Sequence, residues 1–176
     1  MTEDRRIYAL FADLLTYPQE DPTEKARACL DLMRQHPTSA AAVQRFLEFA
    51  QRQDLGRLQE LYTHTFDLNP VCSLYIGYHL YGESFRRGEY MVKLKGAYRA
   101  RGLEPGNELP DHLTLILRYL SASPDASTAL HVITEDVVPA LEAMAKTFEG
   151  SGNAYGEVVG AVKAWLEGEQ VAEGGV

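Results

Sequence analysis

Apolar residues recur along most of this chain at the three- and four-residue spacing of a helix that buries one face. The dipeptide Tyr17-Pro18 ends the first such stretch, which carries Ile7, Leu10, Phe11, Leu14 and Leu15. No segment shows the sustained alternation of apolar and polar residues that predicts a half-buried strand. We therefore expect an all-α fold.

Capping residues and prolines divide the remainder into further helices. Helix starts are expected at Asp21-Pro22, Pro110 and Ser123-Pro124, and caps at Thr38 or Ser39, at Asp54 and at Asn153. An aromatic helix is expected over Leu74 to Tyr81, and a long helix from Ser84 to near Gly102. Pro139 is expected to kink or restart a helix. The pattern predicts a single-domain bundle of about eight or nine helices over residues 1–168. Residues 169–176 are expected to be a frayed tail.

Length and composition agree with one ordinary globular domain, since the chain has 176 residues of which 45% are hydrophobic and 24% charged. The start of the chain does not resemble an export signal, and no apolar run approaches the roughly 20 residues that cross a bilayer. Cys29 and Cys72 lie far apart and suit a reducing compartment. We expect a cytoplasmic protein without stable membrane insertion.

The formal net charge of −8 is unevenly distributed. Residues 61–120 carry seven Lys and Arg against six Asp and Glu, whereas residues 121–176 carry two against nine. Nucleic acid is a poor partner for such a chain. The one basic stretch contains Arg86, Arg87, Lys93, Lys95, Arg99 and Arg101, and a solvated helix face is its simplest interpretation.

Catalytic and metal-binding patterns are weak. The five histidines and two cysteines lack the close pair spacings of a metal site, and the chain has no glycine-rich phosphate loop. Neighbouring residues on a helix point about 100° apart, so Asp111 and His112 do not readily form a dyad with each other. We expect a protein that is not an enzyme and holds no cofactor, with a small metal-independent hydrolase using Asp111 and His112 as the alternative.

Arg87 stands on the apolar stripe of its predicted helix, in line with Leu94 and Tyr98. A charge at such a position needs a carboxylate partner, and Asp67, Glu108 or Asp111 is available in neighbouring segments. The buried ion pair would serve either to fix helix register or to border a ligand site.

Tyrosines are concentrated in the middle of the chain, where Tyr62, Phe66, Tyr75 and Tyr78 supply rings that suit a half-wet groove for an amphipathic helix. A core role is the simpler interpretation of most of these rings. The groove interpretation predicts a polypeptide ligand.

Several runs together closely resemble one family, the nitrate reductase delta-subunit family of molybdenum-cofactor assembly chaperones within the redox-enzyme maturation proteins. The runs are Tyr62-x-x-x-Phe66-Asp67, Ser73-Leu74, Gly82-Glu83-Ser84-x-x-Arg87-Gly88 and Glu108-Leu109-Pro110-Asp111-His112-Leu113, and Leu15-Thr16-Tyr17-Pro18 is similar to the opening of that family. The resemblance implies an all-helical cytoplasmic chaperone. Its partner would be the catalytic subunit of a molybdenum oxidoreductase, recognised by its N-terminal peptide and kept competent for cofactor insertion. Longer family members carry an extended C-terminal region, whereas this sequence stops soon after Trp165, so we expect no function from such a tail.

The predicted peptide-binding residues combine the tyrosine groove with the positions that match the family motifs. They are Tyr62, Phe66, Asp67, Tyr75, Tyr78, Glu83, Arg87, Pro110, Asp111 and His112. We expect Pro110 to begin a helix, Glu108 and Asp111 to meet basic client residues, and His112 to make binding sensitive to pH near neutrality. One alternative is that the corner formed by Glu108 to His112 only organises the fold. Another is that the chain is a stable accessory subunit of the reductase. The chain is expected to be either a monomer or a homodimer.

Overall fold

The computed structural model describes residues 5–122 and 131–173. Within them the chain forms nine α-helices joined by short π-helical and 3-10 turns. The helices are α1 (Arg6–Leu14), α2 (Thr23–Leu32), α3 (Pro37–Ala50), α4 (Leu55–Tyr62), α5 (Ile76–Tyr81), α6 (Phe85–Arg99), α7 (Leu113–Ala122), α9 (Val138–Phe148) and α10 (Ala154–Glu173). The all-α prediction is confirmed.

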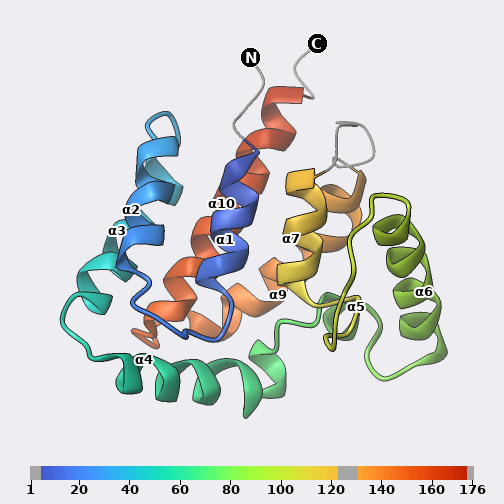
Figure 1. The fold of residues 1–176 in the computed structure, drawn as a ribbon, viewed down its shortest axis with the longest axis horizontal. Helices are drawn as coiled ribbons and strands as arrows, with labels where there is room; N and C mark the ends of the chain where they lie inside the picture. Colours follow the sequence, from blue (N-terminus) through green and yellow to red (C-terminus); the bar gives the residue numbers. More distant parts are fainter. Residues whose placement is uncertain (1–4, 123–130, 174–176) are drawn as a thin grey trace.

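Helix α10 forms the middle of the bundle, where it packs along α3 and α9, while α1 lies between α2 and α7 (Figure 1). The apolar face of α10 buries Trp165, whose ring meets Phe11 of α1 edge-on with centroids 6.4 Å apart. No helix in the described ranges is long and apolar enough to cross a membrane.

An aromatic cluster joins the middle of the chain to this core. Tyr155 of α10 lies 5.4 Å from Tyr62 and 5.5 Å from both Phe46 and Phe66, measured between ring centroids. The Tyr62 hydroxyl donates a 2.9 Å hydrogen bond to the Leu15 carbonyl. The π-helical turn η1 (Thr63–Asp67) continues α4 and turns Phe66 inward, so both motif aromatics are core residues.

Two predicted caps are confirmed. The Asp54 carboxylate accepts a 2.8 Å hydrogen bond from the Arg57 amide at the start of α4, and the Asn153 side-chain oxygen accepts one of 2.9 Å from the Tyr155 amide at the start of α10. Each satisfies an amide that the first turn of a helix leaves unpaired.

Other predicted boundaries are wrong. Helix α3 begins at Pro37, and Ser39 is buried and donates to the Ala161 carbonyl of α10 at 3.0 Å instead of capping. Pro110 does not start a helix either, because α7 begins only at Leu113. Residues 110 and 111 instead form a turn, in which the His112 amide donates to the Leu109 carbonyl at 3.0 Å. His112 then pairs with the extended Tyr75 in an antiparallel bridge just before α7.

Further along the chain, the π-helical turn η3 (Ile133–Val137) runs into α9, where Pro139 occupies the first turn, in line with the predicted restart. The expected start at Ser123-Pro124 lies outside the described residues. Helix α10 extends to Glu173, and the predicted tail boundary stays a prediction.

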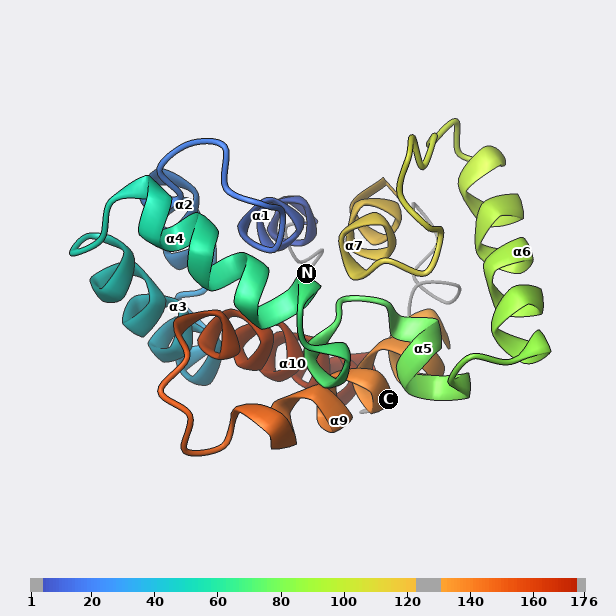
Figure 2. The ribbon, with the colours of Figure 1, turned by 90° about the horizontal axis from the view of Figure 1, so that it is seen from below.

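Helix α6 stands at the edge of the molecule beside α5 (Figure 2). Its inner side buries Tyr90, Leu94 and Tyr98. The segment between α6 and α7 returns along the molecule and brings residues 108–112 against α5. This return creates the site described next.

Candidate functional site

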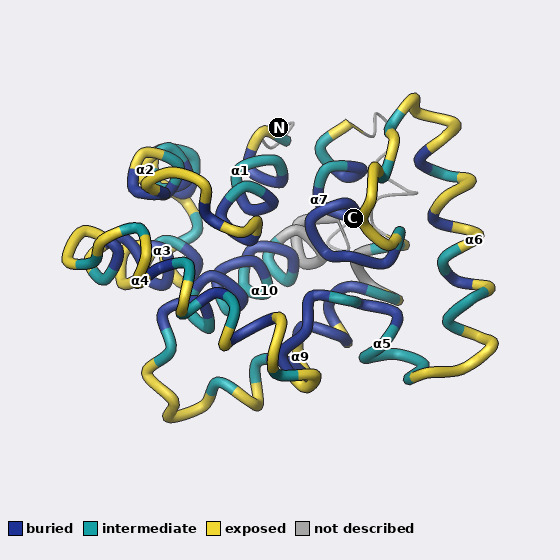
Figure 3. The backbone as a smooth tube through the Cα atoms, turned by 60° about the horizontal axis from the view of Figure 1, so that its bottom comes forward, coloured by how far each residue is buried: buried dark blue, intermediate teal, exposed yellow. Residues whose placement is uncertain are grey.

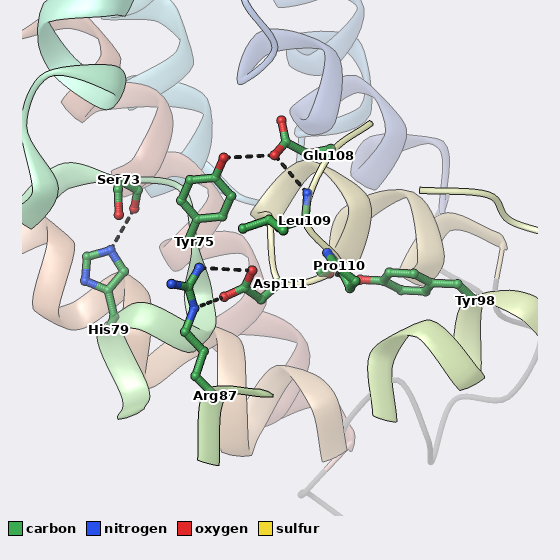
Figure 4. A network of polar contacts seen from close by, with 9 residues as sticks. All are labelled: Ser73, Tyr75, His79, Arg87, Tyr98, Glu108, Leu109, Pro110 and Asp111. Carbon is green, nitrogen blue, oxygen red and sulfur yellow. Dashed lines mark hydrogen bonds and ion pairs between the residues drawn. The ribbon is translucent and has the colours of Figure 1, made fainter. Parts of the chain in front are cut away.

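A buried ion pair links α6 to the segment before α7. The Arg87 Nε atom lies 2.7 Å from Asp111 Oδ2, and Nη2 lies 3.3 Å from Oδ1 (Figure 4). The Asp111 side chain is 0% exposed and that of Arg87 16%. The predicted carboxylate partner of Arg87 is therefore Asp111.

Two tyrosine rings cover the guanidinium. The Arg87 Cζ atom lies 5.5 Å from the ring centroid of Tyr75 and 5.9 Å from that of Tyr78. Both distances are within the range of cation–π attraction. The charge of Arg87 is thus held by a carboxylate and two rings, which suits a guanidinium better than a compact ammonium group.

Gly77 allows the pair to lie against α5. A Cβ atom at this position would stand 2.7 Å from Asp111 Oδ2, 3.0 Å from Tyr90 Cδ1 and 3.2 Å from Arg87 Cγ. Contacts this short force the neighbours apart, so any side chain here disturbs the pair. The sequence analysis did not identify Gly77, because nothing in its local pattern shows what approaches it.

Further hydrogen bonds fix the segment that carries Asp111. The Ile76 amide donates to the Asp111 carbonyl and the Leu113 amide to the Leu74 carbonyl, each at 2.8 Å. The Tyr98 hydroxyl of α6 donates to the Pro110 carbonyl at 2.7 Å. The segment Pro110-Asp111 is therefore held by α6 at Pro110 and by α5 at Asp111, although Pro110 starts no helix.

Glu108 connects this buried layer to the surface. Its Oε1 atom accepts hydrogen bonds from the Tyr75 hydroxyl at 2.9 Å and from the Leu109 amide at 3.0 Å (Figure 4). Partial burial and the Glu108 carboxylate raise the pKa of Tyr75 to about 12. Tyr75 is therefore a neutral donor at physiological pH, with an apolar ring and a polar tip.

Exposed acidic and apolar residues occur in two segments whose carboxylates lie near Tyr75, residues 67–68 and 108–109. Asp67 and Glu108 are exposed, and both carboxylates act on the Tyr75 hydroxyl. Leu68 is 65% exposed and Leu109 44% exposed. We call Asp67, Leu68, Tyr75, Glu108 and Leu109 the acidic corner. Its composition suits a ligand that presents both cationic and apolar groups.

His112 lies just beneath the acidic corner. Its Nδ1 atom is 2.7 Å from the Thr114 hydroxyl, and its ring meets the Tyr75 ring edge-on at 5.1 Å between centroids. Burial lowers the pKa of His112 below its ordinary value, although nearby carboxylates oppose the shift. Because burial disfavours the protonated imidazole, we expect any pH dependence of binding to lie at more acidic values than the range near neutrality first predicted.

The structure separates the ten predicted residues by accessibility. Tyr62 and Phe66 are each only 5% exposed and belong to the core, so in this structure they offer a ligand almost no surface. Asp111 is 0% exposed and both its oxygens face Arg87, so the expectation that it meets client charges directly is also wrong. Asp67 and Glu83 are exposed, and Tyr75 and Tyr78 are half-buried.

The site gives no support to hydrolysis. A catalytic carboxylate must reach its substrate, whereas Asp111 is enclosed and His112 contacts Thr114 rather than Asp111 through Nδ1. No group of three or more potential metal ligands occurs among the residues that the structure describes. What the arrangement does offer is a rigid surface with two exposed carboxylates.

The sequence analysis also missed Tyr98 and Leu109 as parts of this site. Tyr98 belongs to the Arg87 stripe and Leu109 to a family motif, but neither was predicted to contribute to the site. A signal for Tyr98 did exist, because a buried tyrosine hydroxyl needs a hydrogen-bond partner. The sequence did not show that the partner is the Pro110 carbonyl.

Comparison with known proteins agrees with the fold and the motifs. The family model described as nitrate reductase delta subunit matches residues 23–159. NarJ of Escherichia coli strain K12, a nitrate reductase molybdenum cofactor assembly chaperone, is 31% identical over 150 residues, which cover 81% of this chain and 61% of NarJ. NarW of the same strain, named a probable nitrate reductase molybdenum cofactor assembly chaperone, is 34% identical over 121 residues, which cover 68% of this chain and 51% of NarW.

The matched region thus spans about three fifths of the length of NarJ, at 61%. Among solved structures, a crystal structure from Archaeoglobus fulgidus, assigned to the redox enzyme maturation proteins, superposes with a TM-score of 0.64. The superposition covers 95% of this chain and 96% of the other at 21% identity. This likeness concerns the fold.

Proposed function

The chain belongs to the nitrate reductase delta subunit family, and from this premise we propose that it is a cytoplasmic assembly chaperone for the catalytic subunit of a molybdenum-containing respiratory reductase. In this proposal the chain binds the N-terminal segment of that subunit and assists insertion of the molybdenum cofactor. The names of its relatives support an assembly role rather than a catalytic one.

The acidic corner is the observation that carries the proposed binding mode. Asp67 and Glu108 supply negative charge, and Tyr75, Leu68 and Leu109 supply apolar surface beside it. An N-terminal segment with basic residues and one apolar face complements both features. Tyr78 and Glu83, which are also accessible, would extend the contact.

The buried residues have a different role in this proposal. The Arg87–Asp111 pair and the Tyr98–Pro110 hydrogen bond hold the segment that presents Glu108. A surface fixed before binding loses less conformational entropy when a ligand arrives. We therefore assign recognition to the acidic corner and its preorganisation to the buried pair.

Calorimetry with a synthetic peptide copied from the client N-terminus tests the proposal. Wild-type protein should bind it with a negative change in heat capacity, because apolar surface is buried. The double variant Asp67→Asn, Glu108→Gln should bind about tenfold more weakly at low salt, a loss of about 1.4 kcal/mol. The difference should shrink as salt screens the charges.

The matched control is Asp31→Asn with Glu149→Gln, which removes the same charge from exposed positions elsewhere. Equal weakening by both pairs would show a general effect of net charge. Absence of peptide binding to wild-type protein, under conditions where the whole subunit binds, would remove the proposed mode. A chain retained in the purified mature reductase would instead indicate a stable accessory subunit.

A further inference from the structure

Helix α6 presents a second surface, which is independent of the acidic corner. Phe85 is 83% exposed and Val92 73% exposed, the highest values among the large hydrophobic residues of the described chain. Both lie on the outer side of α6, opposite Tyr90, Leu94 and Tyr98. Figure 3 shows exposed residues along that outer side, at the edge of the molecule.

Basic residues flank this apolar line on both sides. Helical spacing places Phe85, Val92 and Gly96 along the centre of the outer side, because they are seven and eleven residues apart. The same spacing places Arg86 and Lys93 on one flank and Lys95 and Arg99 on the other. Glu89 is the only acidic residue within α6. We call these eight residues, Glu89 included, the basic face of α6.

We propose that the basic face of α6 binds an anionic lipid surface. An interfacial helix buries a few apolar side chains at the headgroup boundary, while Lys and Arg on its flanks extend toward the phosphates. Phe85 and Val92 would supply the buried groups. Arg86, Lys93, Lys95 and Arg99 would supply the flanking charges. The attachment is peripheral and leaves the rest of the chain in water.

Charge and shape favour lipid over the other occupants of such a face. Two copies meeting symmetrically through α6 would bring like charges together, which disfavours a dimer through this face. The centre of a protein interface is usually depleted of lysine and has contiguous apolar contacts. Here Phe85 and Val92 are separated by two helical turns, and lysines border them. Because α6 is the outermost element at its edge, it can meet a flat surface along its whole length (Figure 2).

The overall charge of −8 sets the orientation of this contact. An anionic surface repels most of the molecule and attracts only a locally basic face, so α6 should point toward the lipid. The acidic corner carries Asp67 and Glu108 and is expected to remain in water. The two surfaces therefore act separately, and the lipid proposal does not depend on client binding.

Co-sedimentation with vesicles tests the proposal. At low salt the full chain should sediment with vesicles containing phosphatidylglycerol and remain in solution with pure phosphatidylcholine. Each basic residue near an anionic surface strengthens binding about fivefold. The variant Lys95→Glu, Arg99→Glu should therefore bind at least about 25-fold more weakly, and Phe85→Ala with Val92→Ala about tenfold more weakly. All four positions are exposed, so the variants should melt as wild type does.

The matched control is Arg34→Glu with Arg52→Glu, which makes the same change in net charge at exposed positions outside α6. This variant should bind the anionic vesicles nearly as wild type does. The proposal is overturned if wild-type protein ignores anionic vesicles, binds neutral ones equally well, or is weakened as much by the control pair. Binding to polyglutamate without binding to vesicles would assign the face to an acidic protein and would also overturn it.

Discussion

Removing one member of the Arg87–Asp111 pair should destabilise the fold rather than only weaken ligand binding. Asp111→Asn keeps the size of the side chain but removes its charge. The guanidinium is then left 16% exposed, between Tyr75 and Tyr78, without its carboxylate. Breaking a buried pair from one side typically costs about 3–5 kcal/mol.

The two single variants should differ within that range. Asp111→Asn should lie near the lower end, at about 3 kcal/mol, because Arg87 reaches some solvent and retains both rings. Arg87→Ala should lie near the upper end, at about 5 kcal/mol, because Asp111 is 0% exposed and keeps no counter-charge. Arg87→Lys keeps the charge but loses the two-point contact, so its cost should be smaller.

Urea unfolding followed by tryptophan fluorescence measures these values. Trp165 is the only tryptophan in the chain and is 2% exposed, so its emission reports global unfolding. A loss of about 3 kcal/mol corresponds to a melting temperature lower by roughly 6–12 °C for a domain of this size. The double variant Arg87→Met, Asp111→Asn should lose less than the sum of the single losses, because neither charge is left buried alone.

Asp67→Asn is the control, since Asp67 belongs to another of the family motifs but is exposed. Its unfolding free energy should change by no more than about 0.5 kcal/mol. If Asp111→Asn unfolds at the same urea concentration as wild type, the pair does not hold this corner together. The separation between structural and recognition residues would then be wrong.

Two further predictions concern neighbours of the pair. Gly77→Ala should destabilise the protein by about 1–3 kcal/mol, because its Cβ atom would lie 2.7 Å from Asp111 Oδ2. The control is Gly88→Ala in α6, where an added Cβ atom meets nothing within 4 Å, so this variant should stabilise the protein by roughly 0.5–1 kcal/mol. Equal urea midpoints for the two variants would contradict this prediction. Because burial lowers the pKa of His112 from 6.5, the unfolded chain takes up the proton first, so stability should fall as pH drops below 6.5. Urea unfolding at pH 7.5 and 5.5 measures this loss of stability, which should be smaller in His112→Gln than in wild type. The control His64→Gln, at an exposed histidine, should lose as much stability as wild type does. An identical loss in both variants would refute the assignment of the loss to His112.

Local patterns were enough to predict most helices of this fold. Apolar spacing located the stripes of α1 and α7, and polar residues before helical runs identified the caps Asp54 and Asn153. These features depend on residues within one or two turns of each other. The prediction that Arg87 needs a carboxylate also followed from one helix alone.

Features that depend on distant partners could not be predicted in the same way. Ser39 resembles a cap, but its hydroxyl reaches a carbonyl 122 residues away in the sequence. Pro110 resembles a helix start, but residues 110 and 111 form a turn and His112 pairs with Tyr75 in a bridge, so α7 begins only at Leu113. Tertiary contacts override local preference at these positions.

The motif residues show the same limit. Family resemblance identified Phe66 and Asp67 together, but not that the π-helical turn η1 places the first in the core and leaves the second exposed. It likewise grouped Glu108 with Asp111, which the structure divides into a surface carboxylate and a buried one. A motif therefore shows where a site lies, while burial shows which of its residues can meet a ligand.

Capture of the client subunit with and without its N-terminal segment tests the central claim most directly. The cofactor-free catalytic subunit of the reductase would be co-expressed with this chain, either whole or lacking that segment, and purified through a tag on the chain. The account predicts that the whole subunit is retained and that the truncated one is largely lost, with Asp67→Asn, Glu108→Gln also reducing retention. Equal retention of both forms by wild-type chain would contradict recognition through the N-terminal segment.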